Sequence, residues 1–302
     1  MRLGLIGLGR WGSNYLDNLL KISAVEYIHV AARKIQYEDK KKCNVQFTED
    51  WREVCKDSRI NGLIIAVSPE SQYEVTKYAL NMGIPLLVEK PFTLNKKHAH
   101  ELINLSKNSN VLCMVGYTHI YSKGYQDLKL SVKKSGGIRN IYSEGISQGP
   151  YRINTPVLWD WGSHDIAMCI DLLNEKPRSA TVKAIYKNSA NPLSGLFEMN
   201  MVFGSGIMAR CIVGNASEFK RRDFCVICDE GTFLYDGLSA GLSKQYSAKV
   251  FSSDISRFKT QITPLECVIN EFIGAIENQL KYHYTLDLAK NVNETLDKIR
   301  LV

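Results

Sequence analysis

Two side chains capable of acid–base chemistry stand four residues apart in the middle of the chain. Asp160 and His164 lie within residues 158–165, and on a helix this spacing puts both side chains on one face. A histidine can give or take a proton near neutral pH, and a nearby carboxylate can orient its ring and stabilise its charged form. The pair therefore predicts general acid–base catalysis. The alternative is a helix start that favours acidic residues, with a structural histidine beside it.

A lysine follows an apolar run within residues 87–92. Pro91 restricts Lys90, the residue before it, to an extended conformation. Ligands of doubly wound sheets bind beyond the carboxyl ends of the strands, so Lys90 is placed to hydrogen-bond a substrate hydroxyl or a cofactor ribose and to stabilise an alkoxide. The alternative is a surface lysine on a turn.

Three glycines directly follow the first apolar segment, residues 2–6. Gly7, Gly9 and Gly12 have the spacing of a dinucleotide-binding turn, which needs a tight bend, a bare backbone beside the pyrophosphate and close helix packing. We expect a helix over residues 13–21, with its positive N-terminus toward the phosphates. The alternative is a glycine-rich hairpin turn.

The end of the second predicted strand indicates which nicotinamide cofactor is bound. An NAD site usually has an acidic residue there to hold the ribose hydroxyls, but this chain has Ala32, Arg33 and Lys34. Arg33 can offer planar donors to a 2′-phosphate, so we expect NADP(H) to be favoured over NAD(H). The candidate cofactor-binding residues are Gly7, Gly9, Arg10, Trp11, Gly12, Arg33, Lys34, Ser68, Pro69, Glu89 and Lys90.

These residues need a scaffold, and the first part of the chain alternates strand and helix signals. Near-continuous apolar runs are typical of parallel strands covered on both faces, and the alternation predicts a doubly wound α/β sheet. The predicted strands are 2–6, 27–31, 62–67, 85–88 and 111–116, and the predicted helices are 13–21, 51–55, 73–82 and 96–107.

After residue 120 the pattern changes to successive strands with short connections, which predicts an open, mainly antiparallel sheet in an α+β domain. We expect a dinucleotide-binding domain over 1–118 and a substrate-binding and oligomerisation domain over 119–302. A late helix should begin with Thr263 as its cap and Pro264 in its first turn. The expected helices are 122–134 and 161–173, and the expected strands are 140–147, 180–186, 196–203, 206–213, 224–228 and 231–235.

The bulk properties are those of a soluble globular protein: 302 residues, 45% hydrophobic and 23% charged. The net charge of +7 comes with short, scattered basic clusters, such as Arg221–Arg222, which we interpret as solvated surface. We therefore expect no nucleic-acid partner and, without a leader or a long apolar run, a cytoplasmic protein with no membrane contact.

Cys225 and Cys228 could suggest a redox or zinc site, but their strand-like context favours two structural cysteines, and we expect no metal.

Taken together, the three motifs resemble those of the glucose–fructose oxidoreductase / inositol dehydrogenase / MocA-like (Gfo/Idh/MocA) oxidoreductase family. The opening glycine motif, the triplet Glu89-Lys90-Pro91 and the pair Asp160 and His164 have that family's order and spacing. The resemblance covers nearly the whole chain. It implies an N-terminal Rossmann domain and a second domain whose open sheet mediates homodimers or homotetramers.

The same resemblance implies roles for the candidate residues. His164 would be the main acid or base, Asp160 its electrostatic partner, and Lys90 would bind the reacting hydroxyl. The chain departs from the family pattern in the loop after the third core strand and around residues 116–121. These departures leave His119 and Tyr121 as substrate-side candidates. Arg152 is a candidate for holding an anionic group of the substrate, and the alternative is a solvent-facing arginine.

We therefore expect an NADP-favouring oxidoreductase acting on a carbohydrate-like small molecule. A hydride would pass between nicotinamide and a hydroxyl or carbonyl carbon of a sugar, polyol or nucleotide-linked sugar. Two alternatives use the same fold: a non-catalytic NAD(P)-binding sensor, and a reductase of a cyclic non-sugar substrate. Lys90, Asp160 and His164 together argue against the sensor, because a sensor needs no proton transfer.

Overall fold

The computed structural model describes residues 1–33, 44–152, 154–187, 189, 194–239, 242–247, 253–254 and 262–301. The chain forms two compact units. The first unit comprises Met1–Gly116 and Val268–Lys290, and the second comprises Tyr117–Cys267 and Asn291–Val302. The assignment of functional domains to 1–118 and 119–302 stays a prediction.

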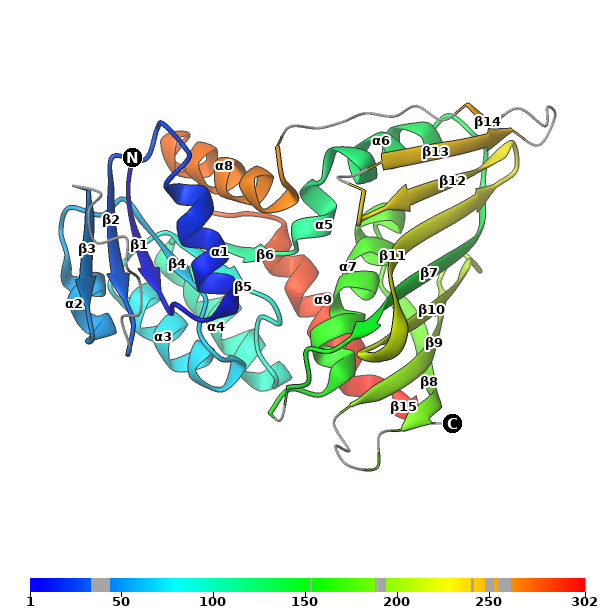
Figure 1. Ribbon diagram of the computed structural model, residues 1–302, viewed down its shortest axis with the longest axis horizontal. Helices are drawn as coiled ribbons and strands as arrows, with labels where there is room; N and C mark the ends of the chain where they lie inside the picture. The colour runs from blue at the N-terminus through cyan, green and yellow to red at the C-terminus, as the bar shows by residue number, and fades with distance from the viewer. Residues whose placement is uncertain are drawn as a thin grey trace. The chain divides into compact units, whose positions relative to one another are not determined.

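The first unit is built on a six-stranded parallel sheet in the order β3-β2-β1-β4-β5-β6 (Figure 1). The expected doubly wound sheet is confirmed. The strand order reverses between β1 and β4, where such sheets bind their ligands. The strands are β1 (Arg2–Ile6), β2 (Tyr27–Ala31), β3 (Val45–Thr48), β4 (Gly62–Ile65), β5 (Leu86–Glu89) and β6 (Cys113–Gly116).

The strands β4, β5 and β6 are buried at every residue, as their apolar runs predict. The edge strand β3 was not predicted, because its half-exposed residues form no apolar run. Helix α3 begins earlier than expected, since Pro69 suits the first helical position after Ser68. The helices are α1 (Arg10–Leu19), α2 (Trp51–Lys56), α3 (Pro69–Asn81) and α4 (Lys96–Ser109).

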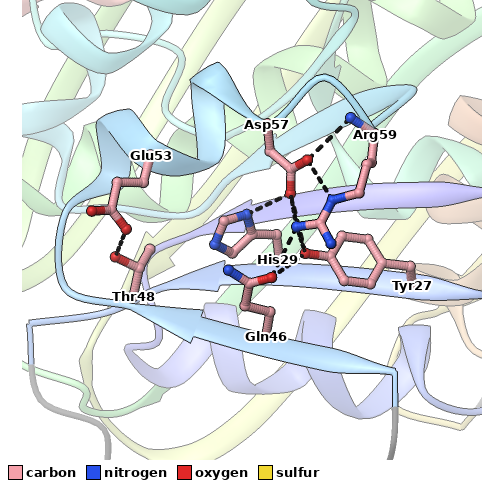
Figure 2. A network of polar contacts seen from close by, with 7 residues as sticks. All are labelled: Tyr27, His29, Gln46, Thr48, Glu53, Asp57 and Arg59. Atoms are coloured by element: carbon pink, nitrogen blue, oxygen red, sulfur yellow. Dashed lines mark hydrogen bonds and ion pairs between the residues drawn. The ribbon is translucent and has the colours of Figure 1, made fainter.

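A polar network ties the end of α2 to the two outer strands, β2 and β3 (Figure 2). Asp57 Oδ2 lies 2.8 Å from His29 Nδ1 and 2.7 Å from Arg59 Nη2. Tyr27 OH donates to Gln46 Oε1 at 2.8 Å. Hydrogen bonds from Arg59 hold the pKa of the Asp57 carboxyl well below its usual range. The network therefore joins three consecutive elements through one buried carboxylate.

The late helix α8 (Pro264–Glu277) contributes to the first unit. The Thr263 hydroxyl accepts a hydrogen bond from Glu266 N at 3.1 Å, which confirms the predicted cap. A Cβ at Gly62 would lie 2.6 Å from Ile276 and 2.9 Å from Phe272, so the helix packs directly on β4. The helix α9 (Thr285–Lys298), which follows α8, was not predicted.

The second unit is built on a nine-stranded, mainly antiparallel sheet in the order β14-β13-β12-β11-β7-β10-β9-β8-β15, as expected. Two pairs are parallel, β7 with β10 and β8 with β15. The strands are β7 (Ile138–Gln148), β8 (Pro177–Lys187), β9 (Gly195–Phe203), β10 (Met208–Gly214), β11 (Ala216–Cys228), β12 (Gly231–Asp236), β13 (Leu242–Ser247), β14 (Ser253–Asp254) and β15 (Arg300–Leu301).

Helices cover one face of this sheet (Figure 1). The Tyr125 ring of α6 contacts Phe224 of β11 and Tyr235 of β12, with ring centroids 6.0 and 6.1 Å apart. Its hydroxyl donates to Met168 O of α7 at 2.8 Å, which joins the two helices. The helices are α5 (Thr118–Tyr121), α6 (Lys123–Val132) and α7 (Ser163–Leu173), and a π-helical turn at Leu158–Gly162 precedes α7.

The opposite face of this sheet carries exposed apolar side chains. Met208 pairs with Val202 across the sheet, and Arg210 pairs with Tyr142. Met208 is 52% exposed and Tyr142 is 43% exposed. None of the helices in the described ranges combines the length and hydrophobicity that a bilayer crossing requires.

Candidate functional site

The glycine loop between β1 and α1 has the close packing that the sequence motif predicts. Gly7 has a φ of +96°, a conformation that favours glycine, and a Cβ there would lie 2.5 Å from Ala66 O. A Cβ at Gly12 would lie 2.0 Å from Gly7 O. Both positions therefore exclude larger residues. A Cβ at Gly9 would meet no atom within 4 Å, so the space above this backbone is open.

The helix α1 begins immediately at this open position. Its first residue is Arg10, with Gly9 as the cap, so the helix starts three residues earlier than expected. No side chain caps the first turn, and its backbone amide groups are the donors that bind a phosphate. The loop therefore fits a dinucleotide pyrophosphate. Trp11, half-buried in the first turn, lies on the same segment.

The other expected cofactor residues lie at the carboxyl ends of the strands. Arg33 is exposed and follows β2 closely, after the buried Ala32. Ser68 and Pro69 form the start of α3, shortly after β4. Lys34 lies outside the described residues. These positions share one edge of the sheet with the glycine loop, because the carboxyl ends of parallel strands lie together.

Gln72, which we did not predict as a functional residue, holds the turn that carries Lys90. Its side chain on α3 is 1% exposed. Its amide nitrogen donates to the carbonyl oxygens of Glu89 at 2.5 Å, Pro91 at 2.8 Å and Phe92 at 3.1 Å. The Gln72 amide group has two hydrogens and lies within hydrogen-bond distance of three carbonyl oxygens. It therefore holds the whole turn in place rather than a single residue.

The buried Glu89 carboxylate connects this turn to α1. Its Oε1 accepts a hydrogen bond from Tyr15 OH at 2.8 Å, and its Oε2 accepts one from Lys90 N at 3.1 Å. Gly116 leaves room for the tyrosine hydroxyl, since a Cβ there would lie 3.0 Å from it. The helix that begins at the glycine loop and the turn that carries Lys90 are thus joined through one side chain.

In the second unit, the structure brings two of the predicted site residues together. His164 lies on the first turn of α7 and His119 on α5. Their ring centroids are 4.9 Å apart and their planes are nearly perpendicular, at 82°. Tyr121 ends the same short helix as His119 and is half-buried.

Both ring nitrogens of His119 have partners within the protein. Nδ1 lies 3.0 Å from Tyr235 OH, and Nε2 accepts a hydrogen bond from Arg222 Nε at 3.2 Å. Burial raises the pKa of Tyr235, which keeps the phenol neutral. His119 is therefore held from two strands, β11 and β12, while its ring contacts His164.

The expectation that Arg222 is solvated surface is wrong. Its side chain is 9% exposed and its Nη1 lies 3.0 Å from Asp165 Oδ2, whose side chain is also buried. The sequence contained a pattern that could have predicted the burial of Arg222. Alternate residues of a strand face the same side, and Arg222 has the same parity as the buried Phe224 and Val226.

Asp160, whose expected role is the electrostatic partner of His164, forms an ion pair with Arg152. Its Oδ2 lies 2.9 Å from Arg152 Nε, and the carboxylate side chain is buried. Asp160 lies in the π-helical turn Leu158–Gly162, whereas His164 lies in the first turn of α7. The ion pair connects two predicted site residues, and it anchors Arg152 beside the start of α7.

Across the chain, the candidate groups are a phosphate-fitting glycine loop, a lysine held at a strand end, and a histidine pair held by buried polar side chains. Such groups can bind a dinucleotide, stabilise negative charge on an oxygen and transfer a proton. Gln72, Arg222 and Asp165 are the supporting residues that the sequence reading missed.

Comparison with known proteins agrees with this chemistry. Residues 1–117 match the GFO_IDH_MocA family model, described as an oxidoreductase family with an NAD-binding Rossmann fold. A 4-carboxy-2-hydroxymuconate-6-semialdehyde dehydrogenase from Sphingobium is 23% identical over 298 residues, covering 91% of this chain and 90% of the relative. An inositol 2-dehydrogenase from Salmonella typhimurium is 26% identical over 213 residues, covering 67% of this chain and 62% of the relative.

The likeness extends to the second unit in solved structures. A crystal structure of a protein from Magnetospirillum magnetotacticum superposes with a TM-score of 0.89 at 25% identity, covering 99% of both chains. The family match, the glycine loop and the two-sheet architecture agree with the resemblance in the motifs. Residues 1–117 thus match the Gfo/Idh/MocA family of oxidoreductases, whose model describes an NAD-binding Rossmann fold, and the whole chain is similar to a solved structure over 99% of its length.

Proposed function

We propose that this oxidoreductase prefers NADP(H) and transfers a hydride to or from a hydroxyl- or carbonyl-bearing carbon of a sugar, polyol or nucleotide-linked sugar. The observation that carries the proposal is His164, placed at the start of α7 and packed against His119, in a chain whose glycine loop fits a dinucleotide. The inositol dehydrogenase relative supports a polyol as substrate.

The proposed roles follow from the donors and acceptors present. The bound nicotinamide supplies the hydride donor or acceptor. His164 takes the hydroxyl proton in the oxidative direction and returns it in the reductive direction. Lys90 donates a hydrogen bond to the reacting oxygen and stabilises its developing charge. Asp160 holds Arg152, which would position the substrate.

The preference for NADP(H) rests on the end of β2. Arg33 is exposed there, and the buried Ala32 leaves the position beside it without a carboxylate that would repel a 2′-phosphate. A guanidinium binds phosphate through parallel N–H donors. Arg33 is therefore the proposed 2′-phosphate ligand.

We also infer that the open face of the nine-stranded sheet binds a second copy of the chain. Exposed apolar residues on neighbouring strands, including Tyr142, Val202 and Met208, are the chemistry of a self-associating surface. A homodimer or homotetramer is the expected assembly. The cytoplasmic location stays a prediction.

A carboxylated semialdehyde is a second candidate substrate class. The Sphingobium relative, which aligns over most of this chain, is named for such a compound. The same His164 and Lys90 would serve its carbonyl group. A panel of inositols, aldoses, ketoses and carboxylated aldehydes, tested with NADP⁺ and NADPH, separates the two classes.

The variant His164→Ala tests the proposed catalytic role. We expect turnover on the substrate found by the panel to fall by about a hundred- to ten-thousandfold, because proton transfer contributes that much. NADPH affinity, measured by fluorescence titration, should stay within about twofold. The control is His98→Ala, at a histidine of α4 that stacks on Tyr73. Unchanged turnover in His164→Ala would remove this residue from the mechanism.

A further inference from the structure

Arg222 occupies a space that the neighbouring strands leave open for it. It lies on β11 opposite Gly145 of β7. A Cβ at Gly145 would lie 2.1 Å from Arg222 Nη1, and a Cβ at Gly237 would lie 2.7 Å from Arg222 Cγ. Glycines on both sides therefore allow a large cation to lie within the helix-covered face of the sheet.

This buried cation contacts both helices that carry the histidine pair. Its Nε donates to His119 Nε2 on α5, and its Nη1 donates to Asp165 Oδ2 on α7. Asp165 directly follows His164 in the chain. A single guanidinium thus holds the side chain of the residue next to one histidine and the ring of the other. Its donors lie on separate nitrogens of a rigid planar group and so hold two partners in fixed directions, whereas a lysine ammonium donates from one rotatable nitrogen.

The hydrogen bond from Arg222 also determines which ring nitrogen of His119 carries the proton. A guanidinium N–H can only donate, so Nε2 must be the unprotonated nitrogen of the ring. The single ring proton is then on Nδ1, which donates to Tyr235 OH. If Nε2 were protonated, its N–H would face the N–H of Arg222 Nε, and two donors would meet without an acceptor. The ring is therefore neutral, and the polar groups facing it include Arg222 from β11, Tyr235 from β12 and His164 from α7.

We propose that Arg222 is a positioning residue that locks His119 in its neutral Nδ1–H form and holds it edge-on against His164. Its importance for catalysis rests on the proposed role of His164. His119 then packs rigidly against the His164 ring and takes no part in proton transfer. The proton chemistry of the pair belongs to His164 alone.

Nuclear magnetic resonance of histidine-labelled protein tests the locked form without any substrate. The chain has 6 histidines, and His119→Asn identifies the signals of the ring in question. We expect the wild-type His119 ring to show the Nδ1–H pattern and to hold it between about pH 6 and 8, where an ordinary histidine titrates. An Nε2–H pattern, or ordinary titration, would overturn the proposal.

The variant Arg222→Met tests whether the arginine is the cause. We expect its His119 ring to titrate or to change tautomer, and the His164 signals, identified with His164→Ala, to shift as the edge-on contact is lost. The matched control is Arg221→Met, on the next residue of β11, where the arginine is half-exposed and pairs with Glu144. The control should leave both rings unchanged.

Removal of Arg222 leaves Asp165 buried without its cation, so Arg222→Met could fail to fold. Arg222→Lys is then measured, since it keeps the positive charge but replaces the planar guanidinium with a single donor nitrogen. Unchanged His119 signals in either folded variant would overturn the proposal. These spectra do not depend on turnover, so a failure of the His164 hypothesis and a failure of the Arg222 hypothesis are separate results.

Discussion

At the scale of the residue, the side chains in and around the candidate site depend on immediate neighbours that limit what each can do. Gln72 and Glu89 fix the backbone around Lys90 through hydrogen bonds, so the lysine side chain extends from a fixed backbone position. Arg222 holds the ring of His119 through a hydrogen bond to Nε2. Arg33, in contrast, is exposed, and its function depends on the ligand that it meets.

The variant Arg33→Asp should weaken NADPH binding and favour NADH. Loss of a charge-assisted hydrogen bond and addition of a negative charge beside the 2′-phosphate should lower NADPH affinity at least about tenfold, the equivalent of about 1.4 kcal/mol. Titration with both reduced cofactors measures the change. Arg52→Asp, at an exposed position on α2, is the control. Equal NADPH affinity in Arg33→Asp and the parent would exclude Arg33 as the phosphate ligand.

At the scale of the element, polar side chains join segments that the apolar core alone would leave loosely connected. The Asp57 network fixes the end of α2 to β2 and β3 (Figure 2). It lies around Tyr27, the first residue of β2, whereas Arg33 lies just beyond the other end of this strand. The network therefore contributes to stability and is separate from the expected cofactor contacts.

The variant Asp57→Asn should destabilise the protein at neutral pH by about 1.5–3 kcal/mol, the usual contribution of a hydrogen bond to a charged group. Arg59 lowers the pKa of Asp57 in the folded state, so this contribution is present above the carboxyl's unfolded pKa of about 4 and is lost as pH falls toward the folded pKa. Urea unfolding between about pH 3 and 7 should therefore show the difference between parent and variant shrinking at low pH. Glu49→Gln, at an exposed position, is the control. If the difference in unfolding free energy between parent and variant stays constant with pH, the ionised Asp57 carboxylate is not the source of this stability.

At the scale of the whole molecule, the open sheet face is the surface through which copies of the chain would associate. Introduction of a charge at its centre should prevent that association, because a carboxylate in an apolar interface loses its hydration without gaining a partner. Tyr142 and Met208 are the exposed positions with which to test this.

The variants Tyr142→Glu and Met208→Glu should shift the protein from an oligomer to a monomer, with cofactor binding retained. Light scattering after gel filtration measures the mass. Leu130→Glu, at an exposed apolar position on α6, is the matched control and should leave the oligomer intact. A parent protein that is already monomeric, or a Tyr142→Glu protein that stays oligomeric, would show that this face is not the interface.

The chain's local patterns predicted a large part of this protein. The apolar runs of β4 and β5, the glycine spacing at Gly7 and the cap at Thr263 depend on residues close in sequence, and each was found where it was expected. Short-range sterics and hydrogen bonding decide such features, so they can be read without the fold.

Contacts between distant segments needed the tertiary structure. The packing of Phe272 on Gly62, the clamp from Gln72 to the Lys90 turn and the burial of Arg222 each join residues far apart in the chain. Arg221 and Arg222 are chemically identical neighbours, yet one is half-exposed and the other is nearly buried. The strand register and the neighbouring glycines, Gly145 and Gly237, determine that Arg222 is the buried one. The sequence by itself thus determined the cofactor fold and the candidate reactive groups. Only the tertiary structure decided which polar side chains hold those groups in place.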